Sequence, residues 1–195
     1  NPLLVADKPW EPRYDNMYPN VLWDEEEEIY KCWYCPFIID ERTSRTAPGK
    51  RNPEATDYMA ARPSKRDEAI LYATSGDGIR WEKPELGIVE FNGSRKNNIV
   101  VRGPSGAGVY RDPQDPNPDR RYKAFYAAQV GYLQLVRFSP DGLHWGPEIP
   151  CPEIAIQSDC HANMIWSEQR QRYLGIVRHY DRIPVVGNRK IARTE

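Results

Sequence analysis

The chain lacks the features that assign a protein to a membrane or to nucleic acid. No stretch approaches the roughly 20 consecutive apolar residues that cross a bilayer, and the first residues lack the basic and apolar regions of a signal peptide. The 27 Lys and Arg nearly balance the 28 Asp and Glu, for a formal net charge of -1, whereas nucleic-acid and membrane-surface binders usually carry a basic excess. We therefore expect a soluble protein with neither partner. Its compartment stays open between a secreted or periplasmic location and the cytoplasm of a bacterium.

Metal and cofactor signatures are also missing. The chain has three His and four Cys, too few in any one cluster for a catalytic zinc site, and it contains no Gly-rich phosphate loop or Ser nucleophile elbow. The pair Cys32 and Cys35 has C-x-x-C spacing, typical of a redox pair or half a zinc site. On a strand, however, positions i and i+3 face opposite sides, so we expect two packed thiols, no metal and no cofactor.

Aromatic and turn-forming residues are plentiful. Six Trp, twelve Tyr and four Phe are too many for a disordered chain. Eighteen Pro and thirteen Gly indicate many turns and few long helices. The composition therefore predicts a folded, strand-rich protein.

One pattern occurs three times: a strand, a polar turn, and a second strand that carries Tyr near its start. A repeat of this kind is a signature of modular folds. In the first copy the acidic run Asp24 to Glu28 is interpreted as a solvated hairpin turn. The predicted hairpins span residues 20–34, 108–126 and 163–178.

A further element follows two of the hairpins. Residues 70–81 and 135–145 both contain a strand, then the pattern S-x-D-G-x-x-W. Asp and Gly favour a tight turn, and Trp81 and Trp145 are expected to begin the next strand and pack beneath it. Asp77 and Asp141 are therefore assigned to this Asp-box-like turn and not to catalysis.

The repeat predicts an all-β fold, a β-propeller of four-stranded antiparallel blades. About three blades fit into 1–195 as one partial domain: blade one about 14–92, blade two about 97–150 and blade three about 158–195. Residues 40–68 form a long polar loop in this interpretation. Because propellers close with about four to eight blades, we expect either a piece of a longer protein or a homo-oligomer that associates through exposed sheet edges.

Polar residues recur near the predicted inner strands, which line the central funnel of a propeller. Asp15 and Asn16 precede the first inner strand, Arg111 and Asp112 end the second, and Asp159 precedes the third. His161 and Asn163 alternate and so share a strand face, Asn20 begins an inner strand, and Arg178 ends an apolar one. Carboxylates that converge on one funnel suit glycoside hydrolysis, although Asp112, before Pro113, can equally cap its turn.

The order of an Asp-Asn motif, Arg111-Asp112-Pro113 and an acid followed by Cys160 resembles the five-bladed glycosidases of the invertase and fructanase family, with the related arabinanases and β-xylosidases. The resemblance implies an incomplete five-bladed propeller. It also implies Asp15 as nucleophile or base, Asp112 as transition-state stabiliser and Asp159 as acid, where the family has Glu. Asn16, Asn20, Arg111, His161, Asn163 and Arg178 would contact the sugar.

Two functions of different class remain open from the sequence. The first is a glycoside hydrolase, or a glycosidase-like propeller, that binds an oligosaccharide or small sugar in its funnel. The alternative is a non-catalytic carbohydrate-binding or assembly module that oligomerises through open blade edges. The sugar, the linkage and the stereochemical outcome are not encoded in any pattern that we can interpret.

Overall fold

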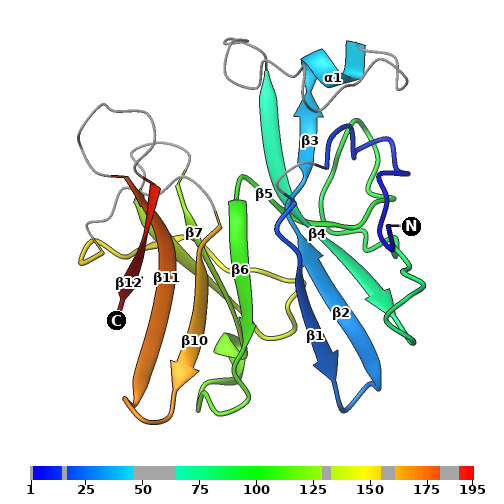
Figure 1. Ribbon diagram of the computed structural model, residues 1–195. Coiled ribbons are helices and arrows are strands. Elements are labelled where there is room, and N and C mark those ends of the chain that lie inside the picture. Colours follow the sequence, from blue (N-terminus) through cyan, green and yellow to red (C-terminus); the bar gives the residue numbers. More distant parts are fainter. Residues whose placement is uncertain (1, 15–16, 46–64, 129–132, 155–160, 181–188) are drawn as a thin grey trace.

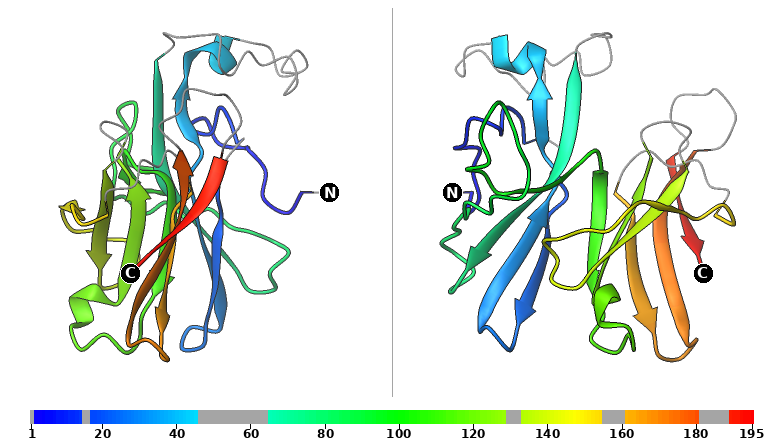
Figure 2. Two further views of the ribbon diagram at one scale, coloured as in Figure 1. Left: turned by 60° about the vertical axis from the view of Figure 1, so that its left-hand side comes forward. Right: turned by 180° about the vertical axis from the view of Figure 1, so that it is seen from behind.

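In the computed structural model, residues 2–14, 17–45, 65–128, 133–154, 161–180 and 189–195 are described. These residues form an all-β structure of three antiparallel sheets that stand side by side (Figure 1). The predicted fold class is confirmed. The sheets are arranged as in a propeller, and they do not close into a ring within the described residues (Figure 2).

The first sheet has the order β1-β2-β4-β3, with β5 on the other edge of β4. The long strand β4 pairs with β2 through its second half and with β3 through its first half. A short helix, α1 (Glu41–Arg45), follows β3. The strands are β1 (Asn20–Asp24), β2 (Ile29–Tyr34), β3 (Phe37–Asp40), β4 (Arg66–Ser75) and β5 (Ile99–Arg102).

The second and third sheets follow in chain order. The second has the order β6-β7-β8-β9, and the third β10-β11-β12. A 3-10 helix, η2 (Pro118–Arg120), lies in the turn between β6 and β7. The strands are β6 (Ser105–Arg111), β7 (Tyr122–Ala127), β8 (Gln134–Ser139), β9 (Ile149–Pro150), β10 (Asn163–Ser167), β11 (Arg172–Tyr180) and β12 (Arg189–Thr194).

The three hairpins form as predicted. β1 pairs with β2, β6 with β7 and β10 with β11, and in the first of these the acidic residues Glu25 to Glu28 make the exposed turn. The first strands of the hairpins are neighbours: β6 contacts both β1 and β10, and a parallel bridge joins Ala107 to Ala162. β1, β6 and β10 are thus the inner strands, and they start at the same end of the molecule (Figure 1).

The two S-x-D-G turns have the same hydrogen bonds. The hydroxyl of Ser139 accepts the backbone N–H of Gly142, and Asp141 accepts those of Leu143 and His144. Ser75 and Asp77 repeat this pattern in the first sheet. The Asp side chains therefore stabilise their turns, as the sequence indicates.

The strand expected to begin at each Trp differs from the prediction. After Trp81, Glu82 makes an isolated bridge with Thr74 and the next strand is β5, and after Trp145 the strand β9 begins only at Ile149. The first sheet instead gains β5, so its pairing extends to Arg102 and past the expected end of the blade at about residue 92.

The core lies between neighbouring sheets. Trp33 of the first sheet is fully buried, and the centroid of its ring lies 5.5 Å from that of Tyr122 in the second sheet. Its indole N–H donates to the carbonyl of Gly142 at 2.6 Å. Between the second and third sheets, Phe125 packs with Ala162 and Val177. These contacts fix the inner strands beside one another.

Cys32 and Cys35 are free and buried, and they belong to different apolar clusters on opposite faces of the first sheet. Burial raises the pKa of each thiol to about 12, so both stay protonated and unreactive near neutral pH. The prediction of two packed thiols is confirmed. Among the described residues, no helix is long and apolar enough to cross a membrane.

Candidate functional site

Three segments, one from each sheet, meet where the inner strands start. The ring of Tyr18, just before β1, stacks on the ring of His161, just before β10, with centroids 4.9 Å apart and planes 18° apart. Gly106 of β6 lies against both of them. A Cβ on Gly106 would come within 2.5 Å of the His161 backbone nitrogen and 3.1 Å of the Tyr18 ring, so only glycine fits between the two segments.

The backbone at this place is unusual. Tyr18 has a φ of 42° and Gly106 a φ of 56°, both in the left-handed region. A bulky aromatic residue adopts that region only where its surroundings hold it there, and such residues cluster at functional sites. Tyr18 is held by the stacked His161 ring and by the side-chain amide of Asn20, which donates to its carbonyl at 3.1 Å.

Asn20 links the first sheet to the second. Its amide N–H also donates to the carbonyl of Ala107 at 2.9 Å, and its amide oxygen accepts the N–H of Val109 at 3.1 Å. Both ends of the amide are therefore engaged within the chain. The residue predicted to contact a sugar lies at the site, and there it holds β1 against β6.

His161 and Asn163 interact with each other, as their shared strand face predicts. The side-chain N–H of Asn163 lies 2.6 Å from Nε2 of His161. Because an amide N–H can only donate, Nε2 is the acceptor and the ring proton is on Nδ1. Burial lowers the pKa of His161 from its ordinary value, which favours this neutral form. Nδ1 is buried and has no hydrogen-bond partner in the described part of the chain.

The remaining predicted residues of this end are placed as follows. Asp15, Asn16 and Asp159 lie outside the described residues. Arg178 is half-buried on β11, two positions beyond Ile176, which pairs with Asn163. In an antiparallel pair this register brings Arg178 to the His161 end of the third sheet.

Asp112 lies at the opposite end. It directly follows β6, and the six steps along the chain from Gly106 to Asp112, at about 3.3 Å each, separate the two residues by roughly 20 Å. Asp112 is only 3% exposed and accepts hydrogen bonds from Lys123 at 3.0 Å, from Gln114 at 3.1 Å and from the hydroxyl of Tyr173. The structure therefore does not bring Asp112 together with Tyr18 and His161.

The Asp112 cluster joins the second and third sheets. Lys123, 2% exposed, also binds Asp115 at 2.8 Å and the carbonyl of Arg120 at 2.8 Å. Burial raises the pKa of Asp112, but the hydrogen bonds from Tyr173 and Lys123 outweigh it, so the pKa is lowered overall. Each polar group has its partner inside the chain, which is typical of a structural cluster.

Arg111 is at the same end as Asp112 and forms an ion pair with Glu26 of the first sheet at 3.3 Å. A cavity of about 230 Å³ also lies toward this end, between the second and third sheets, and its walls are mostly apolar. Its lining includes Phe125, Phe138 and Met164 and none of the residues around Tyr18.

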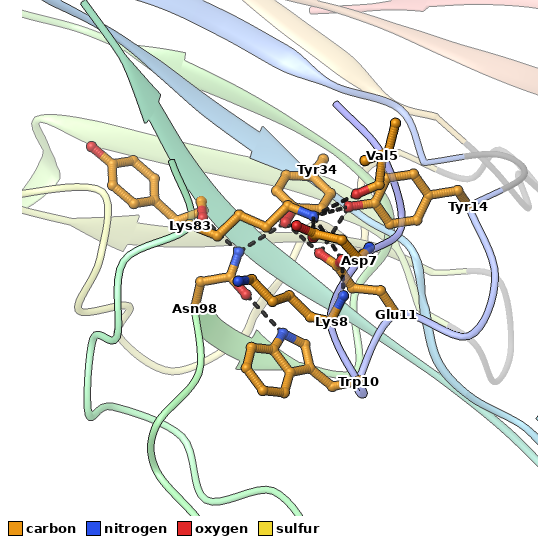
Figure 3. Close-up of polar contacts among 10 residues, drawn as sticks. Val5, Asp7, Lys8, Trp10, Glu11, Tyr14, Tyr34, Lys83 and Asn98 are labelled. Carbon is orange, nitrogen blue, oxygen red and sulfur yellow. Dashed lines mark hydrogen bonds and ion pairs between the residues drawn. The ribbon is translucent and has the colours of Figure 1, made fainter. Parts of the chain in front are cut away.

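A second buried polar network fastens the N-terminal segment to the first sheet (Figure 3). Glu11, 3% exposed, accepts from Lys83 at 2.7 Å, from the hydroxyl of Tyr34 at 2.7 Å and from that of Tyr14 at 2.8 Å. Burial and the Glu11 charge raise the pKa of both tyrosines. Asn98 extends the network to Trp10 and Tyr34. These groups satisfy one another, so the network anchors the segment.

Tyr18 and Gly106 were not predicted as site residues. A signal for Gly106 exists, because a glycine in a strand often marks a close approach of another backbone, and Ser105-Gly106-Ala107-Gly108 opens an inner strand. Tyr18 has no local signal. Within the described residues, no group of three or more His, Cys, Asp or Glu side chains could hold a metal ion.

Comparisons with known proteins bear on the fold. No family model matches the chain, and no curated protein matches it. An N-acetylgalactosamine deacetylase from F. plautii, solved with blood group B trisaccharide, is similar over 90% of this chain and 48% of its own, with a TM-score of 0.50 and 10% identity. A fructofuranosidase from Schwanniomyces occidentalis, complexed with fructosylnystose, covers 89% of this chain and 33% of its own, with a TM-score of 0.46 and 15% identity.

At this identity the likeness to the deacetylase concerns the fold alone. The chain spans about half the length of that deacetylase and a third of that of the fructofuranosidase.

Proposed function

We propose that the chain binds a carbohydrate at the start of its inner strands and forms the sugar-binding part of a glycosidase-like propeller. The single observation that carries the proposal is the contact between Tyr18 and His161. It joins the segment that precedes β1 to the segment that precedes β10, at an end where Gly106, Asn163 and Arg178 also lie.

The contact supports a shared role for two carboxylates. Asp15 comes three residues before Tyr18, and Asp159 comes two residues before His161. Following the resemblance, we assign Asp15 as nucleophile or base and Asp159 as proton donor, the pair that glycoside hydrolysis requires. Asn16 would assist by contacting the sugar.

Asp112 takes another role in this proposal. Because it lies at the far end of β6 and is held by Lys123 and Tyr173, we assign it to the contact between sheets and not to the stabilisation of a transition state. Arg111, paired with Glu26, belongs instead to the contact between the first and second sheets.

His161 defines what the ligand must offer. Its Nδ1–H is a donor without a partner in the described residues, and leaving such a donor buried costs about 1 to 3 kcal/mol. Because Nδ1 is buried, a hydroxyl or carboxylate oxygen of a sugar would accept from it only once the chain that covers it has moved aside. The near-zero net charge suits a neutral sugar and gives no support to a phosphate or a nucleic acid. The deacetylase of similar fold was solved with a trisaccharide.

The test is a panel of oligosaccharides and aryl glycosides, measured by calorimetry for binding and by product release for turnover. We expect a sugar to bind, and Asp159→Asn to lower turnover by about 100-fold or more, since it removes a general acid. Asp119→Asn is the matched control, because Asp119 is exposed in η2 at the other end. No binding across the panel, or equal turnover in both variants, contradicts the proposal.

A second candidate is the non-catalytic module. Binding without turnover in the same panel would select it. Self-association of the chain is part of that candidate. One observation favours self-association: the isoleucines of the third sheet are mostly exposed.

A further inference from the structure

The three hairpins share one register, which makes positions in different sheets comparable. Asn20, Gly108 and Asn163 hold the same place in their inner strands. Their cross-strand partners are Trp33, Phe125 and Ile176, in that order. Trp33 is 0% exposed because the second sheet covers it, and Phe125 is 4% exposed because the third sheet covers it. Ile176 is 52% exposed.

The exposed residue is part of a larger apolar face. Ile165 on β10, 56% exposed, and Ile191 on β12, 83% exposed, point to the same side as Ile176, since cross-strand partners share a face. We call this side of the third sheet the free face. The described residues leave it uncovered, although its counterparts in the other two sheets are buried. The register also places Asn163 and Arg193 beside Ile176, and Arg178 beside Ile191, on this face. Exposed apolar side chains gathered on one face among polar ones mark an interaction site.

The first sheet, at the other end of the row of sheets, also has a partly exposed apolar side. Val21, Val109 and Met164 hold the next register position in their inner strands. Val109 packs against the first sheet and Met164 against the second. Val21 is 49% exposed and its neighbour on the same side, Trp23, is 44% exposed. The N-terminal segment covers the remainder of that side of the first sheet.

We propose that the free face binds the β1 side of the first sheet of a second copy of this chain, in a head-to-tail contact. Such a contact repeats between two copies the packing that joins neighbouring sheets inside one. Three sheets from each copy make six, within the range of about four to eight in which sheets close around an axis.

Charge complementarity selects this occupant. At the turn end of the third sheet, Arg170, Arg172 and Arg193 all bind the carboxylate of Glu195. Glu168 is a second carboxylate in the same turn, so three arginines face two carboxylates and a small basic excess remains. At the same end of the first sheet, the turn carries four exposed glutamates, Glu25 to Glu28. Inside the chain, the ion pair of Arg111 with Glu26 already links neighbouring sheets in this manner. Two free faces brought together would instead oppose arginine with arginine.

The experiment measures the mass in solution by light scattering and sedimentation between about 1 and 100 µM. We expect twice the 22.6 kDa of the chain, and we expect Ile176→Lys to raise the dissociation constant at least 10-fold. Ile79→Lys is the matched control, because Ile79 is 62% exposed in a turn away from the free face. A monomer at every concentration overturns the proposal, as does a dimer that Ile176→Lys leaves intact.

The orientation has its own test. Val21→Cys and Ile176→Cys variants are mixed under mild oxidation, with the wild type as control for its own thiols. Head-to-tail contact predicts a disulfide between the two variants and none in either variant alone. Crosslinking of Ile176→Cys with itself would mean that two free faces meet, which overturns the proposed occupant. Both tests use no sugar, so their outcome is independent of the carbohydrate proposal.

Discussion

Replacing Lys123 with Met removes the cation that holds the second and third sheets together. Lys123 and Asp112 are 2% and 4% exposed in their side chains, and Asp115 is 11% exposed. Met has a similar length and fills the same space, so the change isolates the charge. We expect the remaining carboxylates, above all Asp112, to be left in a buried place without their counter-charge.

The size of the effect follows from this burial. Breaking a buried ion pair by removing one partner costs about 3 to 5 kcal/mol. For a chain of this length, 1 kcal/mol shifts the melting temperature by about 2 to 4 °C, so we expect a loss of about 6 to 20 °C. Lys96→Met, at an exposed position, should stay within about 0.5 kcal/mol.

The assay is urea unfolding monitored by fluorescence, with Asp112→Asn and the double variant added to complete a cycle. We expect the double variant to lose less than the sum of the single losses, because the neutral amide no longer needs the cation. A loss below about 1 kcal/mol in Lys123→Met, or strict additivity, would refute the assignment of Asp112 to a structural cluster.

The pH dependence gives the same experiment a second readout. The folded pKa of Asp112 is lowered, so its contribution to stability is present above the unfolded carboxyl pKa of about 3.9 and is lost as the pH falls through the folded pKa. The gap in unfolding free energy between wild type and Lys123→Met should therefore narrow below about pH 4.

Three further predictions concern other parts of the molecule. Asn20→Ala removes two hydrogen bonds between sheets and should lower the unfolding free energy by about 2 kcal/mol; an unchanged urea midpoint would contradict the linking role. Nitrogen NMR of His161 should show the proton on Nδ1 at pH 7, and a proton on Nε2 would reverse the donor that we assign to the site. Burial raises the pKa of Asp141, but hydrogen bonds, chiefly from the backbone N–H of His144, lower it to about 2. Its stabilising effect is present above about pH 3.9 and lost toward pH 2. The melting temperature of Asp141→Ala should therefore depend less on pH over that range than that of the wild type, and two parallel curves would contradict this role.

The hairpins could be predicted because their information is local. Alternating apolar residues, a polar turn and the Asp-Gly pairs each act over a few residues, and the strands of the three hairpins formed at the expected places. The pairing of β5 with β4 was not predictable in this way, since it joins residues about 30 positions apart in sequence and no turn motif connects them.

The candidate site shows the same division. His161 and Asn163 were predicted from their alternation on one strand face, and the structure brings them together. Asp112 was grouped with them because Arg111-Asp112-Pro113 matches a motif, although the sequence already placed Asp112 at the end of its strand and the other two carboxylates before theirs. Tyr18 reaches His161 only through the packing of separate sheets, and this depends on contacts that no local pattern encodes.

The distance along the chain between strands that pair in a sheet also has a consequence for folding. Within the second sheet, β6 to β9 follow one another in chain order, so each pairing closes a short loop and the sheet can form early. In the first sheet, β2 and β3 must wait for β4, which begins more than 20 residues after β3 ends. The slowest step of folding should therefore be the docking of β4 into the first sheet. The second sheet should be able to pack against the first sheet as soon as that step is complete.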